Sequence, residues 1–175
     1  TDIMLSAPSI VLGLFVYAIA VATVGNFSGY AGSLALSLIA IPVVMRTTEN
    51  MLRLVPGSLR EAAFALGAPR WKVATFVTLR AAKSGVMTGL LLALARISGE
   101  TAPLLMIGMR AFVSTPPSGI TDPATVLPMQ IFLWSDEVDR AFVQNTSAAI
   151  LVLLAFLLTM NGFAIYLRNK FETRW

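Results

Sequence analysis

Two long stretches of the chain contain no charged residue, and they set the pattern of the whole sequence. No Asp, Glu, Lys or Arg occurs from Ile3 to Met45 or from Ala141 to Leu167. A helix needs about 20 apolar residues to cross the ~30 Å hydrocarbon core of a bilayer, and a buried core helix rarely runs this far without a charge. The pattern therefore predicts an integral membrane protein with an all-α fold, a polytopic bundle of transmembrane helices.

Breaks in the apolar pattern divide the chain into four predicted membrane spans. We expect these spans at about residues 3–24, 33–45, 84–107 and 142–167. The turn-forming cluster GNFSGYAG separates the first two spans. The second span is short and has an alternative start near Tyr30. Residues 46–83 and 108–141 are then the two long connections.

Charges in the connections predict the orientation of the chain. Of its 13 basic residues, seven lie in residues 46–83 and three follow Leu167. The positive-inside rule places both segments in the cytoplasm and makes residues 108–141 an external loop. In that loop STPPSGITDP should lack regular structure. Residues 124–134 should lie at the outer membrane interface, with Trp134 in the aromatic belt. The charges of the external loop are Arg110, Asp122, Asp136, Glu137, Asp139 and Arg140.

Composition limits the chemistry of the chain. Its 175 residues are 57% hydrophobic and include no Cys and no His. Thiol catalysis, disulfides and the usual zinc or haem ligands are therefore excluded, and we expect no catalytic residue and no metal site. The net charge of +4 lies beside the predicted spans, so we expect membrane lipid and no nucleic acid as a partner. We also expect no signal peptide, and an N-terminal part beyond this sequence.

The segment SLREAAFALGAPRW, residues 58–71, is predicted to form a helix, a turn and a second helix. Ser58 and Glu61 have the spacing of a capping box, with Ser58 as the N-cap residue. One apolar face is predicted at i, i+3, i+4 and i+7, formed by Leu59, Ala62, Ala63 and Leu66.

The sequence also predicts where this first helix ends. Gly67 fits the left-handed position that follows a helix, and Pro69 fits a stop. A second short helix, about residues 69–79, should follow at an angle. On these residues alone, the segment could also be a linker in which Glu61 merely caps its own helix.

The third predicted span contains two charged residues. Arg96 lies about 12 residues into the span, about 18 Å at 1.5 Å per residue and so near the membrane centre. Glu100 follows four residues later, which places both on one side of a continuous helix. Pro103 cannot donate a hydrogen bond to the carbonyl of Gly99, so we expect the helix to be kinked or opened beside Glu100. The GxxxG of residues 85–89 is expected to be a helix-packing face.

Two interpretations of Arg96 and Glu100 remain open, and both can hold at different stages of a cycle. In the first, the two side chains neutralise each other and are structural. In the second, they line a solute path, where charges at this depth normally lie. The guanidinium of Arg96 would then bind a tetrahedral oxyanion through its bidentate fork, and Glu100 would orient or release it.

The cytoplasmic segment resembles the EAA signature of bacterial ABC importer permeases, which is E-A-A-x-x-x-G, nine residues, then I-x-L-P. Val77 replaces Ile conservatively, whereas Arg80 replaces Pro and leaves the turn into the third span less sharply fixed. The resemblance implies a coupling helix that docks into a cleft on an ATP-binding subunit. ATP and Mg would be bound there, since this chain has no G-x-x-x-x-G-K-[ST] loop and no cofactor of its own. The matching coupling residues are Glu61, Ala62, Ala63 and Gly67.

Longer stretches are similar to the permeases of phosphate importers. They are SAPSIVLGLFVYA, residues 42–72, GETAPLL and LPMQIFLW, and the last two favour the A-type over the C-type subunit. The resemblance implies the MetI-like fold of type I ABC importer permeases, as one partial transmembrane domain over residues 1–175 with four of about six spans. It also implies a multi-pass subunit of the bacterial inner membrane with a cytoplasmic C-terminus. The implied partners are a C-type permease, two ATP-binding subunits and a periplasmic phosphate-binding protein.

Other functions remain to be weighed against an ATP-driven phosphate importer. Spacing alone does not separate phosphate from another oxyanion such as molybdate or sulfate. A passive channel needs no docking helix, so residues 61–67 argue against it. An intramembrane enzyme needs a catalytic set, and the predicted spans contain no His, no Cys and no clustered carboxylate pair.

Overall fold

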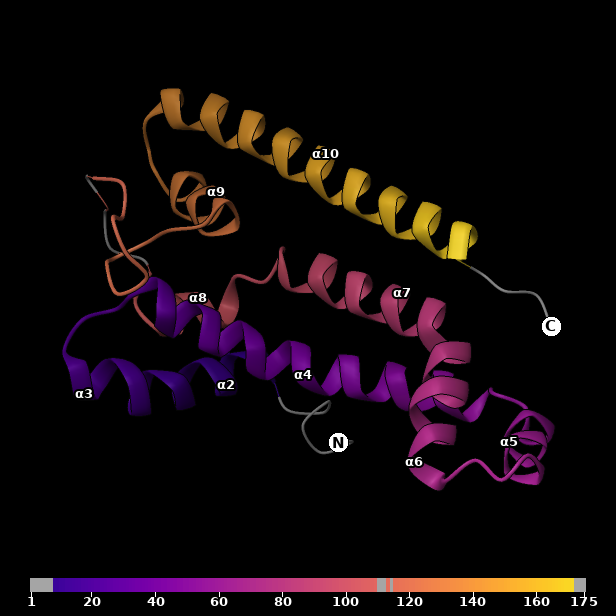
Figure 1. Cartoon of the computed structure of the whole chain (residues 1–175). Helices are drawn as coiled ribbons and strands as arrows, with labels where there is room; N and C mark the ends of the chain where they lie inside the picture. Colours follow the sequence, from indigo (N-terminus) through magenta and orange to yellow (C-terminus); the bar gives the residue numbers. More distant parts are fainter. Residues whose placement is uncertain (1–7, 110–112, 114, 172–175) are drawn as a thin grey trace.

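The computed structural model describes residues 8–109, 113 and 115–171, and every regular element in this part of the chain is a helix (Figure 1). The all-α prediction is therefore confirmed. Several neighbouring elements join into longer helices, including two π-helical segments, η1 and η2. The elements are α2 (Ser9–Val16), η1 (Tyr17–Val21), α3 (Ala22–Val24), α4 (Gly29–Arg53), α5 (Gly57–Ala65), α6 (Arg70–Lys72), η2 (Val73–Thr78), α7 (Leu79–Ile97), α8 (Ala102–Met106), α9 (Leu127–Ser135) and α10 (Arg140–Phe171).

Three helices among the described residues are long and apolar enough to cross a membrane: Gly29–Arg53, Arg70–Ile97 and Arg140–Leu167. A shorter apolar helix, Ser9–Val24, corresponds to the first predicted span, whose start lies outside the described residues. The chain is thus a multi-pass membrane protein. The bounds of its helices differ from those of the predicted spans, because α4 continues to Arg53 and the helix Arg70–Ile97, called the α6–α7 helix, begins well before residue 84.

The long helices α4, α7 and α10 run in alternating directions, and each packs mainly on the next along the chain (Figure 1). The helices α5 and α6 lie at one end of this layer, together with the C-terminal end of α10. The external loop and α9 lie at the other end. This arrangement agrees with the predicted grouping of residues 46–83 with the C-terminal tail.

Close packing of α4 against α7 confirms the predicted GxxxG face. A Cβ atom on Gly85 would overlap the side chain of Met51, and one on Gly89 would lie 2.8 Å from the Cβ of Thr47. Small residues therefore let the two backbones approach. Thr47 and Met51 lie beyond the predicted end of the second span, so α4 continues past residue 45 alongside the first half of α7. The ion pair between Arg53 and Glu49 supports this extension.

The buried core joins three of the stretches that resemble phosphate importer permeases. Its cluster includes Val16 from α2, Leu104 from α8 and Met129 from α9, all under 2% exposed. At Gly13 the backbones of α2 and α8 nearly touch. A Cβ atom there would lie 2.6 Å from the Cα and 2.7 Å from the carbonyl oxygen of Pro103. Backbone atoms cannot move aside cheaply, so glycine is required at this position.

The stretch STPPSGITDP, residues 114–123, is irregular in its described residues, as predicted, and it holds the start of α4. The amides of Gly29 and Tyr30 donate to the carbonyls of Asp122 (3.1 Å) and Ile120 (2.8 Å). These bonds satisfy two of the four helix-start amides that lack an intrahelical partner. The carboxylate of Asp122 accepts from the hydroxyl and amide of Ser118 and from the amide of residue 119. In that order, these bonds lower the pKa of Asp122.

Candidate functional site

The start of α5 differs from the predicted capping box. The helix begins at Gly57, with Pro56 as its N-cap residue and no side-chain capping bond. Pro56 is extended (φ −55°, ψ 137°), and its carbonyl accepts from the amide of Leu59 at 3.3 Å. The prediction that Ser58 and Glu61 cap this helix is therefore wrong. A proline with an extended backbone already starts the helix two residues earlier, so Ser58 lies inside it.

The end of α5 confirms the prediction for Gly67. Gly67 has a φ of +77°. Its amide donates to the carbonyl of Phe64 at 2.9 Å, and the amide of Ala68 donates to the carbonyl of Ala63 at 3.1 Å. This is the Schellman pattern, in which a left-handed residue satisfies the last carbonyls of a helix. The helix is thus terminated by its own backbone.

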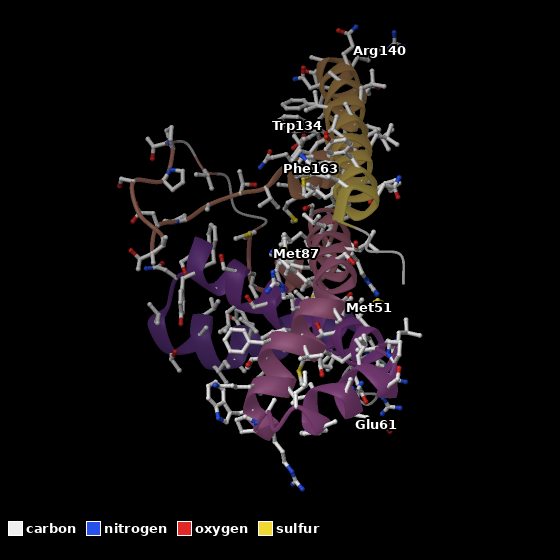
Figure 2. The ribbon with its side chains drawn as sticks, turned by 45° about the vertical axis from the view of Figure 1, so that its right-hand side comes forward. Met51, Glu61, Met87, Trp134, Arg140 and Phe163 are labelled. Atoms are coloured by element: carbon white, nitrogen blue, oxygen red, sulfur yellow. The ribbon has the colours of Figure 1, made fainter. Side chains whose placement is uncertain are left out.

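The predicted apolar face of α5 is divided between the inside and the outside. Leu59 and Ala63 are half-buried, whereas Ala62 is exposed and Leu66 is 89% exposed. Glu61 is exposed and makes no hydrogen bond or ion pair with another described residue. Figure 2 shows Glu61 at the far edge of this end of the molecule, opposite Arg140. Glu61 and Ala62 therefore present an outward surface, whereas Ala63 does so only in part.

A bond that the sequence does not reveal joins α5 to α4. The guanidinium of Arg60 is partly buried, and its Nη2 donates to the carbonyls of Leu52 (2.8 Å) and Val55 (3.3 Å). Arg60 also lines a groove of about 1140 Å³ between α4, α5 and η2. Because the bond crosses a turn to main-chain atoms, no side-chain spacing could have predicted it.

The helix predicted at about residues 69–79 is the first part of the α6–α7 helix. It begins at Arg70 and runs through Arg80 without a turn, so no break occurs where the family pattern has proline. The helix changes direction near η2 instead (Figure 1). Within it, Trp71 and Phe76 are both over 60% exposed and their rings meet edge to face, 6.4 Å apart. Residues five apart do not face each other on an α-helix, but the wider π-helical turn brings them together.

The opposite end of this helix is broken where the sequence predicts. Regular helix ends at Ile97 and resumes at Ala102 in α8. Glu100 lies in the break, so the prediction that it shares one side of a continuous helix with Arg96 is wrong. Its amide still donates to the carbonyl of Ile97 at 3.2 Å. The expected opening beside Glu100 is confirmed, because α8 leaves α7 and packs on α2.

The side chains of Arg96 and Glu100 make no hydrogen bond or ion pair within the described part of the chain. Arg96 is exposed and Glu100 is half-buried. The internally neutralised pair is therefore not formed in this arrangement. Pro103, three residues after Glu100, packs closely against Gly13. Among the described residues, no group of three or more acidic side chains could hold a metal ion.

Comparisons with known proteins agree with this architecture. Residues 1–173 match the sequence profile of a family described as "Binding-protein-dependent transport system inner membrane component". The chain is 50% identical over 172 residues to the "Phosphate transport system permease protein PstA" of Yersinia pestis, covering 97% of this chain. It is 47% identical to proteins of the same name from Pasteurella multocida, over 93% of this chain, and Haemophilus influenzae, over 97%.

The relatives are longer than this chain. The chain spans 57%, 58% and 60% of the Yersinia, Pasteurella and Haemophilus proteins. No solved structure matches it.

Proposed function

Because the chain belongs to the family of binding-protein-dependent transport system inner membrane components, we propose that it is a translocation subunit of an ATP-driven importer of inorganic phosphate. The observation that carries this proposal is α5, a short exposed helix that ends itself through Gly67 and presents Glu61 outward. The names of the relatives favour phosphate as the solute. The chain itself is then non-catalytic.

In this proposal α5 docks on a separate ATP-binding subunit, one of two in the complex, which binds ATP and Mg. The exposed Ala62 lets another surface approach the helix closely, and Glu61 is available to a basic partner. The relatives are named as permease proteins of a transport system, which is consistent with hydrolysis on another chain. Closure of the ATP-binding subunits would push α5 as a rigid body, as alternating access requires.

The proposed solute path passes the break between α7 and α8. Arg96 and Glu100 are free of internal partners among the described residues, and irregular backbone at membrane depth is tolerated only beside protein or water. A guanidinium here can bind an oxyanion, while Glu100 competes for it at another stage. A homologous C-type permease would supply the other half of the path. A periplasmic phosphate-binding protein would deliver the anion.

The substrate is tested by radiolabelled phosphate uptake in cells that express the complete complex, with cells lacking this chain as background. We expect uptake that unlabelled phosphate abolishes and that excess sulfate or molybdate leaves unchanged. Uptake abolished by molybdate or sulfate would assign the permease to that oxyanion instead. Uptake that persists without ATP would indicate a passive channel.

The proposed orientation puts α5 and the C-terminus in the cytoplasm of a bacterial cell and residues 108–141 outside its inner membrane. The chain has no cysteine, so single introduced thiols report their own position. Ser58→Cys should resist a membrane-impermeant maleimide in intact cells, and Val138→Cys, at a position that is 98% exposed, should react. Ready labelling of the Ser58 variant in intact cells would invert the orientation.

A further inference from the structure

The link between α5 and α4 is slight apart from one side chain. Only residues 54–56 separate the two helices along the chain, and the main packing partner of α5 is η2. Leu54 in this connection is 72% exposed. A displacement of α5 would therefore reach the α6–α7 helix directly. It could leave α4 behind if the connection bends.

Arg60 bridges this connection. Its Nη2 binds the carbonyl of Leu52 in the last turn of α4 and the carbonyl of Val55 just beyond it. The C-terminal end of a helix carries partial negative charge, so a guanidinium is well suited to it. Charge-assisted hydrogen bonds are also stronger than neutral ones. Val55 is itself only 7% exposed, so the bridge is anchored on a buried residue.

We propose that Arg60 is a positioning residue that makes α5 move together with the C-terminal end of α4. The inference rests on the proposed coupling role of α5. A push on the outward surface of α5 then reaches two long helices. It reaches the α6–α7 helix through η2 and reaches α4 through Arg60. Without Arg60, the ATP-binding subunits still dock and close, but α4 does not follow.

The test uses the complete complex in proteoliposomes and measures phosphate moved per ATP hydrolysed. Arg60→Gln should keep the ATP-binding subunits bound and ATP hydrolysis active, while this ratio falls about tenfold, the scale set by a hydrogen bond to a charged group. Arg60→Lys keeps the charge without the planar fork, so its ratio should lie between those of Arg60→Gln and the unaltered complex. Arg53→Gln is the matched control, because it removes an exposed arginine paired with Glu49 at the same helix end. Its ratio should stay near that of the unaltered complex.

A cross-link separates positioning from direct contact with the ATP-binding subunit. A short bis-maleimide joining Leu52→Cys to Arg60→Cys restores the tie without the guanidinium, in a chain with no other cysteine. The cross-linked pair should regain most of the transport ratio. A normal ratio in Arg60→Gln, or a cross-linked pair that stays uncoupled, would overturn the proposal. Should Arg60→Gln fail to assemble, the cross-linked pair decides by the same criterion.

A second readout does not depend on the solute. Spin labels at Asn50 and Ser58, both exposed, report the distance between α4 and α5. This distance should stay constant between nucleotide-free and ATP-bound complexes, and should change in Arg60→Gln. Equal distances in both states of Arg60→Gln would contradict the positioning role. An unaltered complex that keeps a constant distance but moves no phosphate would refute the proposed substrate alone.

Discussion

The polar groups near the two ends of the α6–α7 helix differ in whether the chain itself supplies their partners. At the α5 end, the left-handed Gly67 satisfies the last carbonyls of α5, and Arg60 binds carbonyls at the end of α4. At the other end, Arg96 lies just before a break and Glu100 lies in it, and neither side chain has a bonded partner among the described residues. The α5 end is closed by bonds within the chain, apart from the buried Nε of Arg60, so it can meet another protein as a rigid surface. The charges at the break are open to a partner that the described residues do not supply.

The largest effect is expected from removing the two charges at the break. Arg96→Gln together with Glu100→Gln should preserve assembly but reduce phosphate uptake about a hundredfold, because a hydrogen bond to a charged group contributes roughly 1.5–3 kcal/mol. Uptake and co-purification of the ATP-binding subunits are both measured. Lys83→Gln, which removes an exposed charge earlier on the same helix, serves as the control. Full uptake by the double variant would remove the contrast between the two ends.

A smaller effect is expected at the rigid surface. Glu61→Lys reverses a charge that faces outward, so binding of the ATP-binding subunit should weaken about tenfold, since like charges across an interface are repulsive. Co-purification and uptake should fall together, while the thermal stability of the isolated chain stays constant. Glu61→Gln removes the charge without reversing it and should weaken binding less than Glu61→Lys does. Unchanged uptake and co-purification in Glu61→Lys would refute the docking role.

The close approach of α2 and α8, next to the break, should show an effect on stability. Gly13→Ala places a methyl group against the backbone of Pro103, which should cost about 1–3 kcal/mol of folding free energy. Thermal unfolding in detergent measures it. Gly162→Ala, where a Cβ atom meets nothing within 4 Å, should be neutral or stabilising. Equal stability of the two variants would contradict the claim that this approach requires glycine at position 13.

The smallest effect concerns the external loop. The hydrogen bonds from Ser118 and residue 119 lower the pKa of Asp122, so its contribution is complete above the ordinary pKa of about 3.9 and is lost as the pH falls through the lowered value. Protection of the Gly29 and Tyr30 amides from exchange, relative to their intrinsic rates at the same pH, should therefore fall only in acid, because the loop that binds them loosens. In Asp122→Asn this acid step should be absent. An acid step that survives in Asp122→Asn would exclude this carboxylate as its source.

Sequence patterns predicted the features that depend on neighbouring residues. The left-handed Gly67, the opening beside Glu100 and the close packing at Gly89 follow from local sterics, from proline chemistry and from residue size. The capping box failed because Pro56 offers an alternative start for the helix, and local rules rank neither start above the other.

Other features depend on residues that are distant in space or sequence. The bond of Arg60 reaches main-chain carbonyls, which every residue carries, so sequence gives no signal for it. The contact of Gly13 with Pro103 joins two residues that are 90 positions apart in the sequence. Trp71 and Phe76 meet only because η2 widens the helix, and hydrophobic periodicity does not reveal a π-helical turn.

The helix α4 is held at both of its ends by parts of the chain that lie outside it. Carbonyls of the external loop bind its first amides, and Arg60 binds carbonyls at its last turn. Its 25 residues, with Pro42 among them, form a helix about 37 Å long at 1.5 Å per residue. In the proposed coupling, a displacement of this helix by α5 would also carry the loop at its other end. By reciprocity, a ligand that binds this loop would then bias the position of α5.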